Sequence, residues 1–415
     1  MIFFIELLLF VFLGISFGIL TGLTPGVHIN LVSTILLSIS PILLQYVHTI
    51  TLASFIIAMA ITHTFLDFIP SVYLGCPNEA TALSVLPGHR FLLEGMGYEA
   101  VRISIIGSVL GIIFVLCMTP LFLFIVPLVF LKLKDLIVFI LIIIILYMLF
   151  KSKDKNIIFW SVILFSFSGI LGIITFSFSL KDPLFPLFSG MFGVSVLLTS
   201  ISEEVIIPTQ RTTEQVFLPK MKIIWASIVG SFSGCLLTLF PGLGPAQAGA
   251  FGSQFISESD ESSYLILTGA IGSASMLFSL ITLFTIDKAR NGVIVAIQQL
   301  GLGVKEMSVN GVGSSSANNI LLILLVSAAI AACIAIFLSF YFAKIFSAMM
   351  NKINYQFLCF GIIVFITLLV FVFTGFTGIL ILFTSTCLGL LPQFLNIPRS
   401  TLMGCLLLSV VLYGI

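Results

Sequence analysis

The residues best suited to chemistry are two Pro–Gly pairs, each set in a long apolar stretch. Pro25–Gly26 lies in GILTGLTPGVHINLV, and Pro241–Gly242 lies in GCLLTLFPGLGPAQAG. Proline removes a backbone hydrogen-bond donor, and glycine permits unusual backbone angles and close approach, so each pair is expected to break a helix into two halves. A helix that starts at such a break points free N–H groups and the positive end of its dipole into it. The two pairs therefore predict a site for an anion.

Polar residues beside the two breaks would complete this anion site. Thr24 is expected to cap a helix that starts at Pro25, and Pro245 repeats the arrangement in the second half. Beside a helix N-terminus, His28 would stay neutral and donate one N–H to the anion. The alternative is that each Pro–Gly pair simply ends a helix in a surface loop. The candidate substrate-binding residues are Thr24, Pro25, Gly26, His28, Asn30, Asn78, Glu79, Pro241, Gly242, Gly244, Gln247, Arg290 and Asn291.

A second polar break follows each Pro–Gly pair at a similar separation along the chain. The first break is GCPNEATA, which contains Asn78, and the second is DKARNGVIVA, which contains Asn291. Arg290 or Lys288 could pair with a substrate carboxylate. The alternative is that Asp287 and Lys288 neutralise each other at an interface. The same order of elements at similar spacing indicates an internal duplication.

Ionisable residues inside apolar runs are costly in a membrane and are therefore candidate functional groups. His63 and Asp67 are four residues apart in THTFLDF, so they would share one helix face and could relay a proton. The alternative is that Asp67 caps the next turn and His63 is a hydrogen-bonded interior histidine. The stretch VNGVGSSSANNILL offers Ser314 and Asn318 as oxygen ligands for Na⁺, with a solvated loop as the alternative. We expect these four residues to couple transport to an ion.

The remaining polar groups favour a structural role. His89, Arg90, Glu94 and Glu99 lie in LPGHRFLLEGMGYEA, which is typical of an amphipathic segment at the membrane interface. The seven cysteines have no C-x-x-C spacing, so neither a disulfide framework nor a zinc site is expected. No hydrolase, metalloprotease or phosphate-binding-loop motif occurs. We therefore predict a protein that is not an enzyme, without catalytic residues, metal or cofactor, and with H⁺ or Na⁺ as the coupling ion.

The composition indicates the class of protein whose helices hold these residues in place. Of the 415 residues, 60% are hydrophobic and only 8% are charged. Soluble proteins carry about 25% charged residues because their surface faces water. A net charge of +1 also gives no electrostatic footprint for nucleic acid. The chain is therefore expected to be a multi-pass protein of the cell membrane, which excludes a soluble enzyme and a nucleic-acid-binding protein.

The charge-free runs set the expected architecture. They cover 7–66, 103–131, 136–150, 156–180, 183–202, 223–257, 262–286, 307–343, 353–398 and 400–415. A spanning helix needs about 20 apolar residues, so the longest runs hold two or more, and the total is about a dozen membrane segments. The N-terminal stretch has no basic region and contains Glu6, which indicates a retained helix rather than a cleaved signal.

The expected fold is an all-α polytopic membrane protein made of two repeats, which we expect to be inverted and to contain re-entrant half-helices. The repeats would cover 1–200 and 223–415, with a polar connector at 201–222. The basic clusters are Lys151, Lys153 and Lys155, and then Lys344 and Lys352. The positive-inside rule places both clusters in the cytoplasm.

These motifs resemble those of the TctA-type large membrane subunit of tripartite tricarboxylate transporters. The resemblance rests on GLTPG, PNEATALSVLPG and GMGYEAVRISIIGSVLG in the first half, and on FPGLGPAQA and the later SANN in the second. It implies a secondary transporter, a permease with two related halves, that works with a small membrane subunit and a binding protein. The Pro–Gly pairs are more distantly similar to those of PopT-like polyprenyl-phosphate carriers, whose anionic cargo is attached to a lipid.

The expected function is secondary active transport of a small organic anion, such as a di- or tricarboxylate, by symport with H⁺ or Na⁺. One alternative is a flippase for a polyprenyl or other lipid phosphate, and another is an intramembrane enzyme. The expected partners are the anion or lipid phosphate, membrane lipid and a second copy of the chain in a homodimer, with no nucleic acid.

Overall fold

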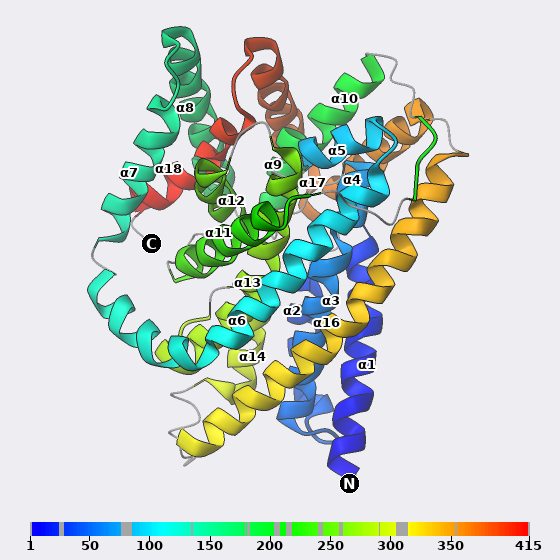
Figure 1. The fold of residues 1–415 in the computed structure, drawn as a ribbon, viewed down its shortest axis with the longest axis vertical. Coiled ribbons are helices and arrows are strands. Elements are labelled where there is room, and N and C mark those ends of the chain that lie inside the picture. Colours follow the sequence, from blue (N-terminus) through cyan, green and yellow to red (C-terminus); the bar gives the residue numbers. More distant parts are fainter. Residues whose placement is uncertain are drawn as a thin grey trace.

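The computed structural model consists of helices joined by short connections (Figure 1). It describes residues 2–24, 29–75, 85–133, 136–178, 180, 183–202, 208–212, 218–239, 244–256, 260–289, 291–303, 314–352 and 355–413. Within these ranges every regular element is an α-helix, a 3₁₀ turn or a π turn, and no strand occurs. This confirms the predicted all-α class.

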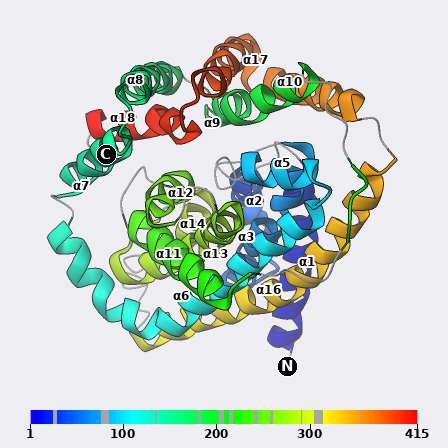
Figure 2. The same ribbon diagram turned by 45° about the horizontal axis from the view of Figure 1, so that its top comes forward.

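The helices form two lobes, which are separated most clearly in Figure 2. The core lobe contains α1 (Ile2–Leu23), α2 (Ile29–Leu43), α3 (Thr49–Leu66), α4 (Phe68–Leu74), α5 (Val85–Leu93), α6 (Gly97–Leu133), α11 (Lys220–Thr238), α12 (Pro245–Gly252), η2 (Ser253–Phe255), α13 (Glu261–Ile286), α14 (Gly292–Ile297), η3 (Gln298–Leu302) and α16 (Ser314–Met350). The flanking lobe contains α7 (Ile137–Phe150), α8 (Lys155–Ser177), α9 (Leu184–Phe188), η1 (Ser189–Val194), α10 (Ser195–Ser202), α17 (Tyr355–Leu395), η4 (Arg399–Met403) and α18 (Gly404–Tyr413). Contacts between the lobes are concentrated where α4 meets α17, α5 meets η1 and α12 meets η4.

Two central helices, α3 and α13, organise the core lobe. They belong to the apolar segments Thr49–Leu74 and Glu261–Ile286, and the most apolar stretch of each segment is fully buried inside the protein. Helices α1 and α16 pack on α3, and helices α11 and α6 pack on α13. The central helices therefore face protein on all sides, while their neighbours form the outer layer.

Glycine residues let the helices around α3 and α13 approach closely. A Cβ atom added at Gly18 of α1 would lie 2.6 Å from Thr62 Cβ of α3. One added at Gly230 of α11 would lie 2.6 Å from the carbonyl oxygen of Leu267 on α13. Small residues allow such backbone-to-backbone packing, which stabilises helix pairs where lipid offers no hydrophobic driving force. The same device is thus used in both halves of the chain.

Two long helices connect the lobes. Helices α6 and α16 each contain 37 residues and lie side by side with opposite directions (Figure 1). Helix α6 packs on α13 of the second half before the chain enters the flanking lobe at α7. Helix α16 packs on α3 of the first half before the chain enters that lobe at α17. Each half therefore covers the central helix of the other.

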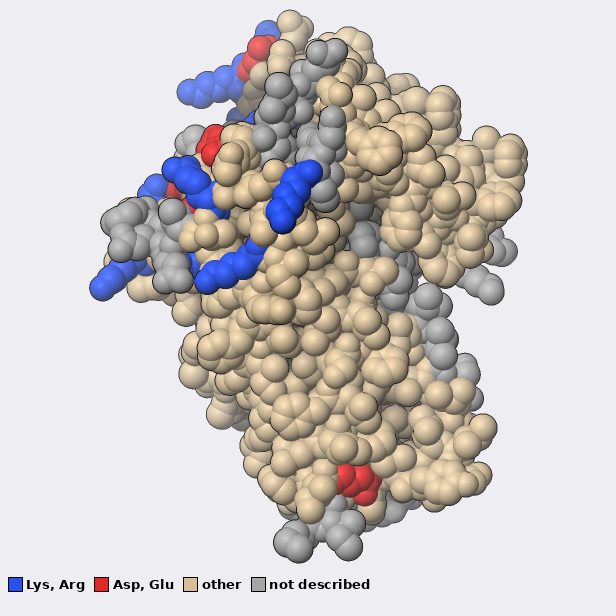
Figure 3. All heavy atoms as spheres, turned by 90° about the vertical axis from the view of Figure 1, so that its right-hand side faces the viewer, with Lys and Arg blue, Asp and Glu red and all other residues tan. Residues whose placement is uncertain are grey.

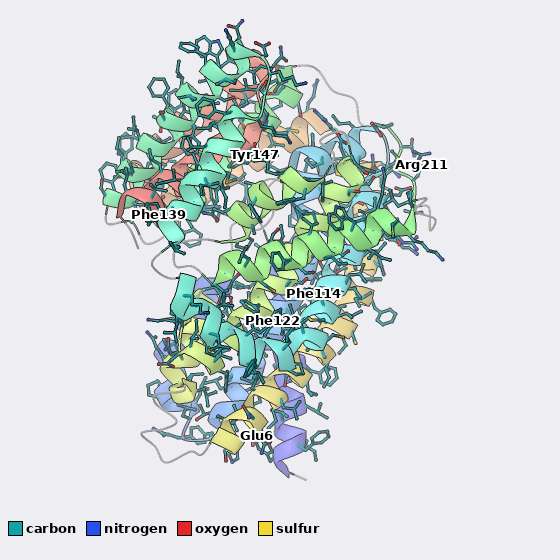
Figure 4. All side chains as sticks on the ribbon, turned by 60° about the vertical axis from the view of Figure 1, so that its left-hand side comes forward. Glu6, Phe114, Phe122, Phe139, Tyr147 and Arg211 are labelled. Carbon is teal, nitrogen blue, oxygen red and sulfur yellow. The ribbon has the colours of Figure 1, made fainter. Side chains whose placement is uncertain are left out.

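The outer surface of the flanking lobe is apolar and aromatic. Figure 4 shows Phe139 and Tyr147 of α7 pointing away from the protein, and their exposed fractions are 64% and 53%. Exposed aromatic and aliphatic side chains also cover α17, including Phe357 and Phe394. Such a surface suits contact with lipid, as expected for a membrane protein.

Eight helices in the described ranges are long and apolar enough to cross a membrane, fewer than the expected dozen segments. One reason is that three apolar segments, Leu141–Phe150, Gly292–Leu302 and Arg399–Leu412, form helices of only 10–17 residues. Another is that the run at 353–398 forms the single element α17, although Gly375 divides it with a φ of 67°.

Charged side chains gather at one end of the molecule (Figure 3). At this end Arg90 of α5 contacts Glu261 at the start of α13, with a nitrogen–oxygen distance of 2.5 Å. Next to it, Lys222 of α11 contacts Asp260 at 2.7 Å. These ion pairs tie the last turn of α5 and the start of α11 to the start of α13.

The two ends of the molecule differ strongly in charge. Figure 4 shows Arg211 towards the charged end and Glu6, which pairs with His48, at the opposite end. Lys151 lines a cavity together with Arg90, and Lys344 lies 5.9 Å from the Tyr98 ring near the start of α6. Both predicted basic clusters therefore contribute to the charged end.

Candidate functional site

The first Pro–Gly pair lies between α1 and α2. Helix α1 ends at Leu23, Thr24 is exposed directly beyond it, and helical structure resumes at Ile29. Helix α2 then includes the backbone of Asn30. Pro25, Gly26 and His28 lie outside the described residues, as does the side chain of Asn30. One helix therefore ends just before the first predicted break, and another begins just after it.

The second Pro–Gly pair lies between α11 and α12. Helix α11 ends at Thr238, and α12 begins at Pro245 with Gly244 as its extended N-cap residue. The prediction that a helix starts at Pro245 is therefore confirmed. Gln247 is buried, and its Oε1 accepts the backbone N–H of Gly244 at 2.8 Å. This bond fixes the first turn of α12, while Pro241 and Gly242 lie outside the described residues.

Helices from the two halves meet beside these breaks. Helix α2, which follows the first Pro–Gly pair, packs against α14 and η3 of the second half. Asn291 caps α14, because its Oδ1 accepts the backbone N–H of Ile294 at 2.9 Å. Arg290, Asn78 and Glu79 lie outside the described residues. Helices that follow predicted breaks thus come from both halves, and two of them, α2 and α14, pack against each other in the core lobe.

The predicted ion-coupling residues His63 and Asp67 are buried at the end of α3. His63 Nδ1 lies 3.1 Å from Thr21 Oγ1 of α1, one turn before Thr24. The backbone N–H of Asp67 donates to the carbonyl oxygen of His63 at 2.9 Å, so Asp67 is the C-cap of α3. These two residues therefore lie beside the first break, inside the core lobe.

The other two predicted ion-coupling residues lie elsewhere. Ser314 is the first residue of α16, and Asn318, one turn later, is exposed. Further along the same helix, Ser339 Oγ donates to the carbonyl oxygen of Phe65 on α3 at 3.1 Å. A helix rises 1.5 Å per residue, so Asn318 lies about 30 Å along α16 from that contact. The four residues predicted as one set do not form a single site.

A cavity of about 890 Å³ lies between the two lobes. Its walls come from α5, η2 and α13 of the core lobe and from α7, α10 and the α17–η4 connection of the flanking lobe. Arg90, Lys151 and Arg399 line it together with one carboxylate, Glu261. Small-ligand sites typically have volumes of about 300–1,000 Å³. The cavity is therefore large enough for a ligand, and the charged residues described in its largely apolar lining are mostly cationic.

A histidine joins the lobes at this cavity. His89 of α5 is 3% exposed, and its Nε2 lies 3.3 Å from Ser200 Oγ of α10. Burial lowers the pKa of His89 to about 4, which outweighs the opposite effect of the Val72 backbone. His89 is therefore neutral at physiological pH and contributes a hydrogen bond but no charge.

The sequence pattern favours a structural role for His89 and Arg90 and assigns no role to Arg399. The residues that form the cavity are about 300 positions apart in sequence, so no local spacing could connect them. One signal was present: Arg399 is the single charge between the apolar runs 353–398 and 400–415. A lone charge in such a setting is a functional candidate in a membrane protein.

Comparison with known proteins agrees with the helical, apolar character of the chain. A protein of Methanocaldococcus jannaschii described as uncharacterized is 32% identical over 419 residues, which cover 98% of each of the two chains. No solved structure matches the chain. The family model described as "Tripartite tricarboxylate transporter TctA family" matches residues 8–404. With nearly its whole length matched, the chain belongs to the tripartite tricarboxylate transporter TctA family, as its Pro–Gly motifs suggested.

Proposed function

We propose that this chain is a permease that carries a small organic anion, such as a di- or tricarboxylate, across the cell membrane. The observation that carries the proposal is the packing of α2 on α14, two helices that follow polar breaks in opposite halves of the chain. Broken helices at corresponding places in two halves are typical of the substrate site of secondary transporters. Membership of the TctA family supports a carboxylate as cargo.

In this proposal the anion is held by backbone N–H groups at the helix starts and by polar side chains beside them. Thr24, Pro25, Gly26, His28 and Asn30 would supply the first-half part of the site. Pro241, Gly242 and Gly244 would allow close approach of the anion in the second half, with Gln247, Arg290 and Asn291 beside it. Asn78 and Glu79 would complete the first half.

Coupling to an ion gradient is assigned to the region around His63. The His63–Thr21 contact links a titratable side chain of α3 to the helix that precedes the first break. A proton taken up at His63 or Asp67 would change the charge next to the anion site, which favours H⁺ as the coupling ion. Ser314 and Asn318, about 30 Å away along α16, would instead form a separate Na⁺ site.

The lobes offer a route to alternating access. Interfaces with few contacts between rigid bodies permit relative motion. The core lobe would therefore move against the flanking lobe, carrying re-entrant α2 and α12 with it. The opposite directions of α6 and α16 support an inverted relation between the two repeats, at 1–200 and 223–415. By the positive-inside rule, the charged end would face the cytoplasm.

The proposed partners follow from the family. A tripartite transporter combines its large membrane subunit with other components, and we propose a small membrane subunit and a binding protein for this chain. The apolar outer face would contact lipid, and a homodimer could use part of the same surface.

The test is uptake of radiolabelled citrate and succinate into proteoliposomes that contain the chain and its partner subunits. We expect uptake that depends on an imposed pH or Na⁺ gradient. Gly26→Leu and Gly242→Leu should each reduce it by about tenfold or more, because misplacing a binding group by about 1 Å can cost a hundredfold. Gly361→Leu is the matched control, since a Cβ atom there meets nothing within 4 Å.

Two results would contradict the proposal. One is gradient-driven uptake that survives both Pro–Gly substitutions. The other is the absence of carboxylate uptake together with a change in surface-exposed prenyl phosphate, which would identify a lipid-phosphate flippase instead.

A further inference from the structure

The cavity between the lobes combines features of a binding site that lies apart from the Pro–Gly breaks. It encloses about 890 Å³, and both lobes contribute to its walls. Its polar lining includes hydroxyl and amide groups, among them Ser200, Thr401 and Gln254. Each of these groups already donates a hydrogen bond within the chain, Ser200 to the Val196 carbonyl, Thr401 to the Pro398 carbonyl and Gln254 to the Ala250 carbonyl, so recognition of a ligand falls to the charged side chains.

Arg399 is the cation in this cavity that most needs a ligand. It is half-buried in a largely apolar part of the chain, and its side chain forms no ion pair or hydrogen bond with any residue that the structure describes. Guanidinium groups stay charged at physiological pH, and a charge removed from water is stabilised when it is paired. Arg399 therefore favours an anionic partner from outside the chain.

Arg90 faces the same cavity from the other lobe. It is engaged by Glu261 at 2.5 Å, and Lys151 adds a further positive charge. Among the described residues that line the cavity, three cationic side chains thus face one carboxylate, which gives this part of the lining an excess of positive charge. An arginine presents a planar fork that binds carboxylate or phosphate oxygens through two parallel hydrogen bonds.

We propose that this cavity is a binding site for a multivalent anion, with Arg399 of the flanking lobe and Arg90 of the core lobe as its principal ligands. The ligand is recognised through carboxylate or phosphate oxygens. It competes with Glu261 for Arg90, so its binding exchanges an ion pair within the core lobe for a bridge between the lobes. The site lies at the charged end of the molecule. It depends on the proposed function only for the chemical class of the anion that binds there.

His89 and Ser200 close one wall of this site without adding charge. Their contact joins α5 to α10. Because the histidine is neutral, the positive charge among the described lining residues comes from the arginines and Lys151. Removing a positive charge from the cavity should therefore weaken anion binding, whereas removing the negative charge of Glu261 should strengthen it.

The experiment is calorimetric titration of citrate into the purified full-length chain in a zwitterionic detergent. Arg399→Gln should weaken binding by about tenfold or more, because a neutral amide cannot form the charge-assisted hydrogen bonds that a guanidinium forms with an anion. Glu261→Gln should tighten binding, because it releases Arg90 for the anion. Arg211→Gln is the matched control, because this exposed cation lies at the same end outside the cavity.

A second arm distinguishes a soluble anion from a lipid headgroup. Thermal unfolding is compared in nanodiscs of phosphatidylcholine with and without phosphatidic acid. Arg399-dependent stabilisation by phosphatidic acid alone identifies a lipid phosphate as the ligand, and Arg399-dependent citrate binding identifies a soluble carboxylate. Either result supports the site.

Two outcomes overturn the inference. One is that Arg399→Gln binds citrate as tightly as the unmodified chain and is stabilised by phosphatidic acid to the same extent. The other is an equal loss in Arg211→Gln, which would show that general surface charge is responsible. If the chain binds citrate through Arg399 but catalyses no uptake, the cavity site is supported. The proposed transport function is then refuted.

Discussion

The interfaces within the core lobe and the interface between the lobes are built in contrasting ways. Within the core lobe, a Cβ atom added at Gly107 of α6 would collide with the carbonyl oxygen of Ile266 on α13, and one at Gly269 of α13 with that of Ser104 on α6. Between the lobes, a polar contact such as His89–Ser200 stands beside a cavity of about 890 Å³. Close-packed backbone resists displacement, whereas a polar, partly open interface can exchange its contacts.

This difference indicates which parts of the molecule can move relative to each other. The core lobe is held by direct helix-to-helix packing, which at Gly107 and Gly269 leaves no room for an extra methyl group. The lobes are held to each other by a few contacts that involve α4, α5 and α12. Motion between lobes is therefore easier than motion within the core lobe. The following predictions test this contrast.

The largest effect is expected from Gly107→Leu. The new side chain would force α6 away from α13 along a buried interface, and overpacking of this kind costs about 3 kcal/mol or more. We expect a marked fall in the thermal unfolding midpoint in detergent, or loss of folded protein on size-exclusion chromatography. Gly361→Leu is the control, because its Cβ would meet nothing within 4 Å. Equal stability of the two variants would show that the core interface is less tight than described.

A cross-link between the lobes should have the next largest effect. Cysteines replace His89 and Ser200 in a chain freed of its seven native cysteines, and a short bismaleimide joins them. If transport requires the lobes to move, uptake should fall by about tenfold or more, as expected when a conformational step is blocked.

The control for this cross-link stays within one lobe. Thr199 Oγ1 donates to Gln393 Oε1 at 3.1 Å, and both residues belong to the flanking lobe. Cysteines at these two positions, joined by the same reagent, should leave uptake intact. Normal uptake in the cross-linked His89–Ser200 pair would show that the lobes do not separate during transport.

The smallest effect concerns the pH dependence of stability. The folded protein lowers the pKa of His89 to about 4, chiefly through burial, so the unfolded chain binds more protons than the folded one between about pH 6.5 and 4. Stability should therefore fall as the pH drops through this window, by up to about 1 kcal/mol per pH unit. His89→Gln keeps a neutral hydrogen-bonding group and should flatten the profile between pH 6.5 and 5. An unchanged slope in this variant would show that His89 is not buried as a neutral group.

The helical class and the site of helix breakage were predictable from local sequence. Pro245 starts α12 because proline suits the first turn of a helix, whatever the helix packs against. The number of spans was less predictable. Charge-free runs do not reveal where a helix will be short, as in Leu141–Phe150, or where one glycine such as Gly375 will divide a long element.

The candidate sites were only partly predictable. His63 and Asp67 could be paired because they share one helix, and both are buried in the core lobe. Ser314 and Asn318 were grouped with them from chemistry alone, and the geometry of α16 places them far away. Arg90 and Arg399 were not connected, because the packing of η4 beside α12 brings distant segments together.

The sequence by itself determined that the chain is a helical membrane protein of the TctA family in which helices end before and resume after each Pro–Gly pair, because these features depend on composition and local backbone chemistry. The tertiary structure alone decided that each half covers the other's central helix. It also decided that the lobes meet around a cationic cavity. Such features depend on contacts between residues far apart in the chain, for which neither periodicity nor spacing carries a signal.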